Sequence, residues 1–152
     1  QGMSPGIAAT VISVFSVSIA LGSLLFGMNA HRFPQRLVLF AGAALVTGGA
    51  VLMGQVDRPA LGYFTAAVLG LGLGGIATML PVTLADYFGR AHYGAIRGVF
   101  LPVQVAGQAA GPLVAGALHD ATGSYVVGLT VFAALSGLAA LIALTTSAPA
   151  KV

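Results

Sequence analysis

The feature that most constrains this sequence is the alternation of long apolar segments with short polar turns. The five apolar segments are residues 5–30, 37–54, 59–84, 94–118 and 124–146. Each comes close to or exceeds the ~20 residues that an α-helix needs to cross a bilayer. The connections of roughly 4–10 residues require neighbouring helices to run antiparallel. We therefore predict an all-α membrane protein, with residues 1–152 forming a single domain of five transmembrane helices.

Composition supports lipid rather than water as the surrounding solvent. Hydrophobic residues make up 58% of the chain and charged residues 6%, whereas soluble domains carry about 25% charged residues. The net charge of +3 comes from basic residues in turns, not from one helix face, so we expect the lipid bilayer as a partner and no nucleic acid. The chain has no Cys, which excludes disulfides and thiolate metal sites.

The basic residues predict an orientation. If the first basic turn is cytoplasmic, that side carries five basic residues and the other side carries only Arg58. The five are Arg32, Arg36, Arg90, Arg97 and Lys151. This bias places the N-terminus outside and the C-terminus in the cytoplasm. An uncharged N-terminus outside, without a leader and with an odd helix count, is uncommon in a complete protein, so we expect the chain to be a fragment.

Polar side chains within the apolar segments are few and uncharged, because Asp57, Asp86 and Asp120 all lie at segment ends. The first segment carries one stripe of small residues at three- and four-residue spacing. Its members are Ser13, Ser16, Ala20, Ser23 and Gly27. For this stripe, close helix packing is favoured over ligand contact.

Two further polar positions are candidates for substrate contact. Gln104 and Gln108 lie one turn apart near the middle of the fourth segment. A buried amide in hydrocarbon needs a partner, and substrate contact and interhelical hydrogen bonding both remain open. Thr78 lies one turn before Pro81 and favours a structural role, because a Thr hydroxyl can satisfy a carbonyl that a proline leaves free.

The sequence offers no chemistry typical of an enzyme. Residues 70–75 match G-x-G-x-x-G, but they lie inside an apolar segment without a preceding strand, so close helix contact or a flexible point is favoured over dinucleotide binding. His31, His92 and His119 fall in three different turns. No Ser/His/Asp arrangement or metal-ligand spacing is present. We expect no catalytic residues, metal or cofactor, although a membrane-embedded enzyme stays open as a rival class.

Three stretches carry a resemblance to a known family. They are residues 86–98 (DYFGRAHYGAIRG), the glycines and proline at Gly107, Gly111, Pro112 and Gly116, and residues 120–125 (DATGSY). They resemble the C-terminal half of a major facilitator superfamily transporter, most closely the monocarboxylate and oxalate–formate antiporter-like branch. Residues 27–36 (GMNAHRFPQR) are similar to the family's G-x-L-A-D-R-x-G-R-K loop, with His31 at the position of its Asp and Pro34 at the position of its second Gly.

The resemblance implies that the five segments are the eighth to twelfth helices of a twelve-helix transporter in the bacterial inner (cell) membrane. Such a protein moves a small solute by alternating access between two halves, and the N-terminal half is then the missing partner. By analogy the first, third and fourth helices face the substrate, and the second and fifth are outer scaffold. The substrate-contacting residues would be Ser13, Ser16, Thr78, Gln104 and Gln108.

Gating and cargo are also expectations from the resemblance. Gly107, Gly111 and Pro112 would allow close helix approach and bending. Arg32, Arg36, Asp86, Arg90 and Arg97 would form a cytoplasmic charge cluster that latches one state, with simple topology retention equally open. A small organic anion such as a monocarboxylate is expected, although the first segment lacks the basic residue usual in that branch. A non-transporting membrane component that packs against a partner chain is the alternative.

Overall fold

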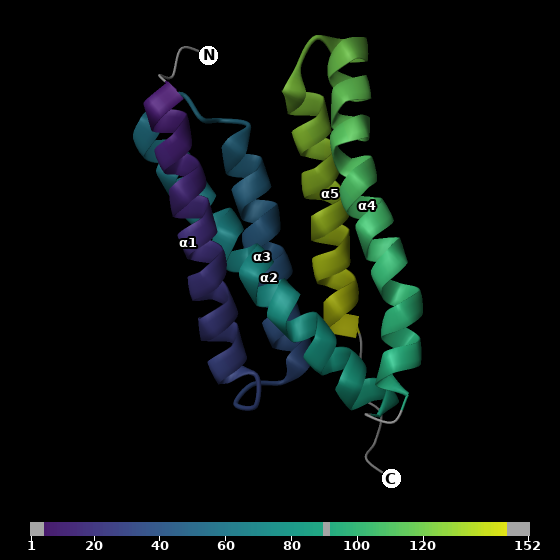
Figure 1. The fold of residues 1–152 in the computed structure, drawn as a ribbon. Coiled ribbons are helices and arrows are strands. Elements are labelled where there is room, and N and C mark those ends of the chain that lie inside the picture. Colours follow the sequence, from purple (N-terminus) through teal and green to yellow (C-terminus); the bar gives the residue numbers. More distant parts are fainter. Residues whose placement is uncertain (1–4, 90–91, 146–152) are drawn as a thin grey trace.

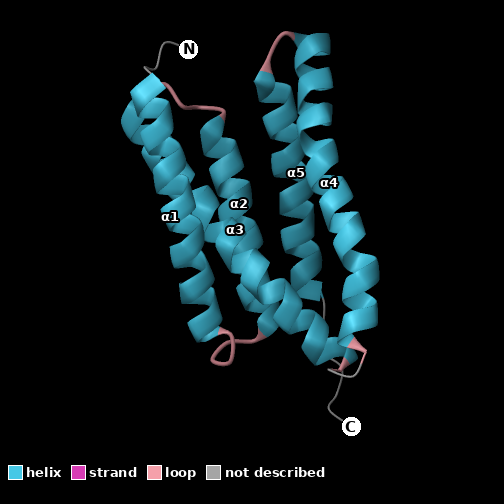
Figure 2. Ribbon diagram, viewed as in Figure 1, coloured by secondary structure: helices cyan, strands magenta, loops and turns pink. Residues whose placement is uncertain are grey.

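The protein is a bundle of five long helices, with no strand among the residues described here (Figures 1 and 2). The computed structural model describes residues 5–89 and 92–145. The helices are α1 (Pro5–Asn29), α2 (Gln35–Met53), α3 (Pro59–Phe88), α4 (Tyr93–Thr122) and α5 (Tyr125–Thr145). All five are long and apolar enough to cross a membrane. The predicted all-α membrane fold is therefore confirmed.

The helix ends follow local chemistry. Proline occupies the first position of α3, where its missing N–H would be unpaired in any case. Gly123 ends α4 with φ +69°, and its N–H donates to the carbonyl of His119 over 2.7 Å. This left-handed conformation favours glycine, which has no Cβ to clash. Both α3 and α4 contain 30 residues, or about 45 Å, so they extend past a hydrocarbon core of about 30 Å into the polar turns.

Helix α3 packs between α1 and α2, and glycines on two of its faces permit this (Figure 1). A Cβ built on Gly70 would lie 2.6 Å from the carbonyl oxygen of Phe15 in α1. A Cβ built on Gly72 would lie 2.8 Å from the carbonyl oxygen of Gly42 in α2. Neither side of α3 could approach its neighbour so closely with a larger residue. The prediction that residues 70–75 serve close helix contact is confirmed.

Helix α5 packs mainly against α2, and α4 lies at the edge of the bundle. Helix α5 packs against α2 and α4, whereas α4 contacts α3 over a short stretch only. No described residue of α4 is buried. Figure 1 shows the α1–α2 and α3–α4 connections at one end of the bundle and the α2–α3 and α4–α5 connections at the other. Helix α4 therefore keeps a long unpartnered face in the described chain.

Candidate functional site

The strongest candidate site is a cavity of about 230 Å³ between the second half of α3 and the first half of α4. It combines a basic side chain and an amide with an apolar wall. Its lining residues are Ala77, Leu80, Pro81, Leu84, Arg97, Phe100, Leu101 and Gln104. We name it the α3–α4 cavity. A cavity with an apolar wall and a few polar groups is typical of small-molecule sites.

The α3 wall of this cavity is shaped by Pro81, which lies inside the helix. Proline has no N–H and crowds the preceding turn, so the carbonyl of Ala77 receives no backbone hydrogen bond from position 81. Both residues line the cavity. A polar backbone group is thereby available on a wall that is otherwise apolar.

The α4 wall contributes Arg97 and Gln104, which lie seven residues, or about two turns, apart on one face. The Nη1 atom of Arg97 donates to the Tyr93 hydroxyl over 2.7 Å, and the guanidinium carbon lies 5.8 Å from the centre of the Tyr93 ring. Arg97 is partly buried and Gln104 is exposed. Tyr93 thus orients the guanidinium with both its hydroxyl and its ring.

The other predicted substrate residues lie elsewhere. Ser13 and Ser16 are exposed on α1, and their hydroxyls donate to the carbonyls of Ala9 and Ile12 in the same helix. Gln108 is exposed on α4 and does not line the α3–α4 cavity. The structure therefore brings Gln104, but not the two serines, to this cavity.

Thr78 takes part in the contact between α1 and α3. Its hydroxyl donates to the carbonyl of Gly74 over 3.0 Å, and its methyl group lies 3.4 Å from a Cβ built on Gly27. The hydroxyl of Ser23 on α1 donates to the same Gly74 carbonyl over 3.1 Å. The Thr78 hydroxyl thus bonds Gly74, whereas the carbonyl that Pro81 leaves free belongs to Ala77.

The structure describes four of the five residues that were predicted to form the cytoplasmic charge cluster. The carboxylate of Asp86 at the end of α3 accepts a hydrogen bond from the Gln35 amide at the start of α2. In the described ranges, Asp86 makes no ion pair with Arg32, Arg36 or Arg97. The ion pair found there joins Arg58 and Asp57 over 3.8 Å. Arg90 lies outside the described residues.

The predicted packing positions on α4 face open space. A Cβ built on Gly107 or Gly111 would meet nothing within 4 Å among the described residues. Pro112 is exposed beside them. No neighbour within the described chain approaches this part of α4, so the close approach predicted there requires a helix other than α1, α2, α3 or α5.

Two of the close contacts between α1 and α3 involve α1 residues, Ser18 and Gly22, that sequence reasoning did not single out. Ser18 is 6% exposed and lies against Gly70, and Gly22 lies against the backbone of Leu71. Ser18 and Gly22 are four residues apart, as are Gly70 and Gly74. This small-xxx-small spacing is the signal that could have identified the α1–α3 interface.

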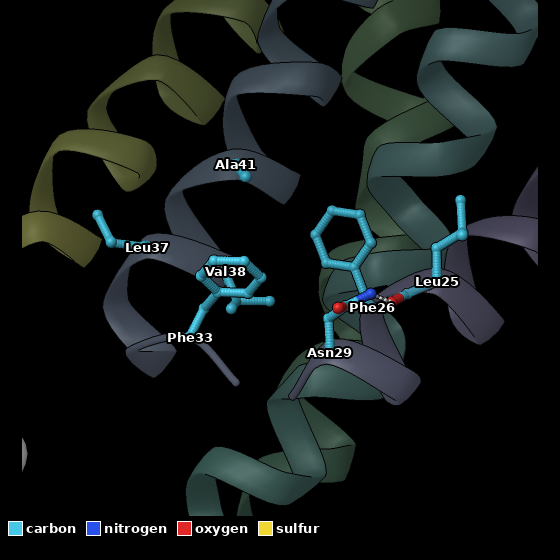
Figure 3. Close-up of a pocket in the computed structure, with 7 residues that line it drawn as sticks. All are labelled: Leu25, Phe26, Asn29, Phe33, Leu37, Val38 and Ala41. Carbon is cyan, nitrogen blue, oxygen red and sulfur yellow. Dashed lines mark hydrogen bonds between the residues drawn. The ribbon is translucent and has the colours of Figure 1, made fainter. Parts of the chain in front are cut away.

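A second cavity, of about 330 Å³, lies between the end of α1 and the start of α2 (Figure 3). Phe26 and Asn29 line it from α1, and Val38 and Ala41 line it from α2. The Asn29 amide donates to the carbonyl of Leu25 over 2.8 Å. Since the one polar side chain on its wall bonds its own helix, this cavity offers less to orient a polar ligand than the α3–α4 cavity does.

Metal chemistry finds no support in the part of the chain that the structure describes. No group of three or more His, Cys, Asp or Glu side chains there could hold a metal ion. His119 stacks on the ring of Tyr125 with centroids 4.0 Å apart. His119 lies in the last turn of α4, not in a connection as the sequence predicted, and this ring contact joins the end of α4 to the start of α5.

Comparison with known proteins gives a consistent result. Residues 1–152 match the profile of the Major Facilitator Superfamily. The chain is 27% identical over 108 residues to an MFS-type transporter, TwmF, of Talaromyces wortmannii, which covers 71% of this chain and 20% of the relative. It is 32% identical over 131 residues to a triacylglyceride transporter of Mycolicibacterium smegmatis, and this match covers 78% of this chain and 23% of the relative. The chain thus spans about a quarter or less of these curated relatives. No solved structure matches.

Proposed function

Because this chain belongs to the major facilitator superfamily, we propose that it is part of a transporter that moves a small solute across the membrane by alternating access. In this proposal the five helices are the eighth to twelfth of twelve. The remaining helices, on the same or a separate chain, supply the other wall of the substrate path. The single observation that carries the proposal is the exposed polar face of α4.

This face of α4 carries two amide side chains, which are unfavourable in contact with lipid. Gln104 and Gln108 lie eleven and fifteen residues after Tyr93, or about 16 and 22 Å along a helix of about 45 Å, so both lie near its middle. Gln108 follows one turn later, and both side chains are exposed. A polar group facing hydrocarbon without a partner is costly, so this side of α4 suits a water-filled path or another helix.

The arrangement of basic residues supports an orientation for the proposed transporter. Arg32 lies in the α1–α2 connection and Arg97 near the start of α4, which share one end of the bundle, whereas Arg58 lies at the other end (Figure 1). In our proposal the arginine-rich end is cytoplasmic and the N-terminus of this chain is outside. Arg32, Arg36, Asp86, Arg90 and Arg97 then latch one state of the transport cycle, and the host membrane is a bacterial inner membrane.

The proposed cargo is a small organic anion such as a monocarboxylate. Ser13, Ser16, Thr78, Gln104 and Gln108 remain the proposed substrate-contacting residues. Of these, Gln104 has the strongest support, because it shares a cavity with a cationic side chain. Gly107, Gly111 and Pro112 are proposed to let α4 bend and approach a helix of the missing part.

A lipid cargo is the second candidate. It is favoured by the Mycolicibacterium smegmatis relative, whose name describes a triacylglyceride transporter. A triacylglyceride has no ionised group, so it would suit an apolar surface such as the cavity between α1 and α2 rather than a cavity that contains an arginine side chain. Binding of an anionic cargo is therefore expected to depend on Arg97, whereas binding of a triacylglyceride is not.

Flux through reconstituted vesicles tests the proposal. The full-length protein containing this chain, placed in liposomes, is expected to accumulate a labelled monocarboxylate down an imposed gradient, and protein-free liposomes are not. Labelled triacylglyceride provides the second arm. Absence of flux in both arms, with the protein correctly inserted, would favour the alternative of a membrane component that only packs against a partner chain.

A further inference from the structure

We infer that Arg97 and Gln104 form an oxyanion subsite, in which the Arg97 guanidinium holds the carboxylate of a small organic acid at the cytoplasmic mouth of the α3–α4 cavity. The inference rests on the proposed transport function and assigns the anion-recognition residue within it. The first helix supplies no basic side chain for that role, because residues 5–30 contain none. Arg97 is a cation on a different helix that already faces a cavity.

The geometry leaves the guanidinium available for a carboxylate. Among the described residues, the hydrogen bond of the guanidinium runs from Nη1 to the Tyr93 hydroxyl at 2.7 Å, so the Nε–Nη2 edge keeps two parallel N–H groups that can donate to a carboxylate. In the described ranges no carboxylate lies within the 4.0 Å of an ion pair with Arg97. A partly buried cation without a counter-charge is stabilised by an anion that enters the same space.

The apolar residues of the cavity suit the hydrocarbon part of the ligand. Leu80, Leu84, Phe100 and Leu101 surround the polar groups with apolar surface. Gln104 lies about two turns, or ~10 Å, deeper along α4 than Arg97, where its amide can bind a second polar atom. The volume of about 230 Å³ is below the 300–1,000 Å³ of sites for drug-sized ligands. A short-chain monocarboxylate fits these limits.

An anionic lipid headgroup offers the same oxyanion chemistry, so the test must separate the two sources. The full-length protein is purified in a neutral detergent, and its thermal unfolding midpoint is measured with propionate, with its neutral analogue propionamide, and with phosphatidylglycerol in place of phosphatidylcholine. Ligands that bind the folded state raise the midpoint. Propionate is expected to raise it in wild-type protein and propionamide is not.

Arg97→Gln is expected to weaken the propionate affinity about tenfold to a hundredfold, as for loss of a charge-assisted hydrogen bond. Arg97→Lys keeps the charge but not the two-pronged geometry and should recover part of the affinity. Arg58→Gln is the matched control, because it removes the same charge from an exposed position at the opposite end of the bundle. If Arg97→Gln does not fold, Gln104→Leu serves instead and is measured with lactate, whose hydroxyl gives the Gln104 amide a second polar atom to bind; a loss of about threefold is expected.

The outcomes separate this inference from the proposed function. Equal propionate affinity in wild type and Arg97→Gln overturns the inference, even if wild-type vesicles show flux. A midpoint that responds through Arg97 to phosphatidylglycerol but not to propionate also overturns it, in favour of a lipid site. Propionate binding that depends on Arg97 without any flux supports the subsite and contradicts the transport proposal.

Discussion

The hydroxyls of Thr47 on α2 and Ser136 on α5 lie 2.8 Å apart, so a hydrogen bond joins these two helices. Each hydroxyl has a single proton, so one of them donates across to the other, and the accepting hydroxyl donates to a carbonyl of its own helix, Ala43 for Thr47 or Ala133 for Ser136. Gly137 lies beside the pair, with its Cβ position 3.5 Å from the Thr47 methyl group. Small residues and hydroxyls therefore bring α2 and α5 together in a membrane that supplies little hydrophobic driving force.

Ser136→Ala is expected to destabilise the bundle modestly. Interhelical side-chain hydrogen bonds in membranes contribute about 0.6 kcal/mol on average, and Thr47 keeps its bond to Ala43 in the variant. Thermal unfolding of the full-length protein in detergent measures the change. Thr145→Ala is the matched control, because the Thr145 hydroxyl donates only within α5, to Ile142. A change of the same size in both variants would contradict an interhelical role for Ser136.

Two glycine substitutions are expected to have opposite signs. Gly74→Ala should lower the free energy of unfolding by about 1–3 kcal/mol, because the new methyl group would overlap the Ile19 carbonyl and lie 2.9 Å from the Ser23 nitrogen. Gly48→Ala should raise it by about 0.5–1 kcal/mol, because nothing lies within 4 Å of that position and alanine favours the helix. The measurement is denaturant unfolding in detergent. A Gly74→Ala variant at least as stable as wild type would contradict close contact between α1 and α3.

Gly111→Leu is expected to block transport in the full-length protein without affecting membrane insertion. The reason is that α4 is proposed to bend at Pro112 and to approach another helix over Gly107 and Gly111. Flux in vesicles and the amount of inserted protein are measured together. Ala109→Leu is the control, since Ala109 is exposed on α4 and lies on another face of the helix than Gly111. Normal flux in Gly111→Leu would remove the hinge proposal.

Cysteine labelling tests the proposed orientation, and the described chain contains no Cys to interfere. Gln55→Cys in the α2–α3 connection is expected to react with a membrane-impermeant maleimide in intact cells. His31→Cys in the α1–α2 connection is expected to react only after lysis. Both native residues are exposed. The reverse pattern would place the arginine-rich turns outside and contradict the positive-inside assignment.

Much of the fold could be predicted from the sequence, while little of the site could. Five spanning helices follow from the length of the apolar segments. The glycines of residues 70–75 also indicated close packing before the structure placed Gly70 against α1 and Gly72 against α2. In contrast, the serines of the α1 stripe bond to different partners in the structure. Ser23 bonds the backbone of α3, whereas Ser13 and Ser16 bond their own helix and are exposed.

The physical reason is that a membrane helix shows weak amphipathicity. In water, burial of apolar surface marks the inner face of a helix by its hydrophobic period. In a bilayer, lipid and neighbouring helices are both apolar, so the same side chains suit either surface. The period of α1, α3 or α5 therefore could not predict which face meets which helix. Small residues and the few polar groups were the remaining signals.

The sequence by itself determined the number of helices, their order, their antiparallel course and the separation of charges between the two ends. These properties depend on segment length and on the cost of placing charges in hydrocarbon. Only the tertiary structure decided that α3 lies between α1 and α2, that α4 keeps an open face, and that Arg97 and Gln104 share a cavity with Pro81. These properties depend on how closely backbones can approach, which is set by pairs of residues on different helices.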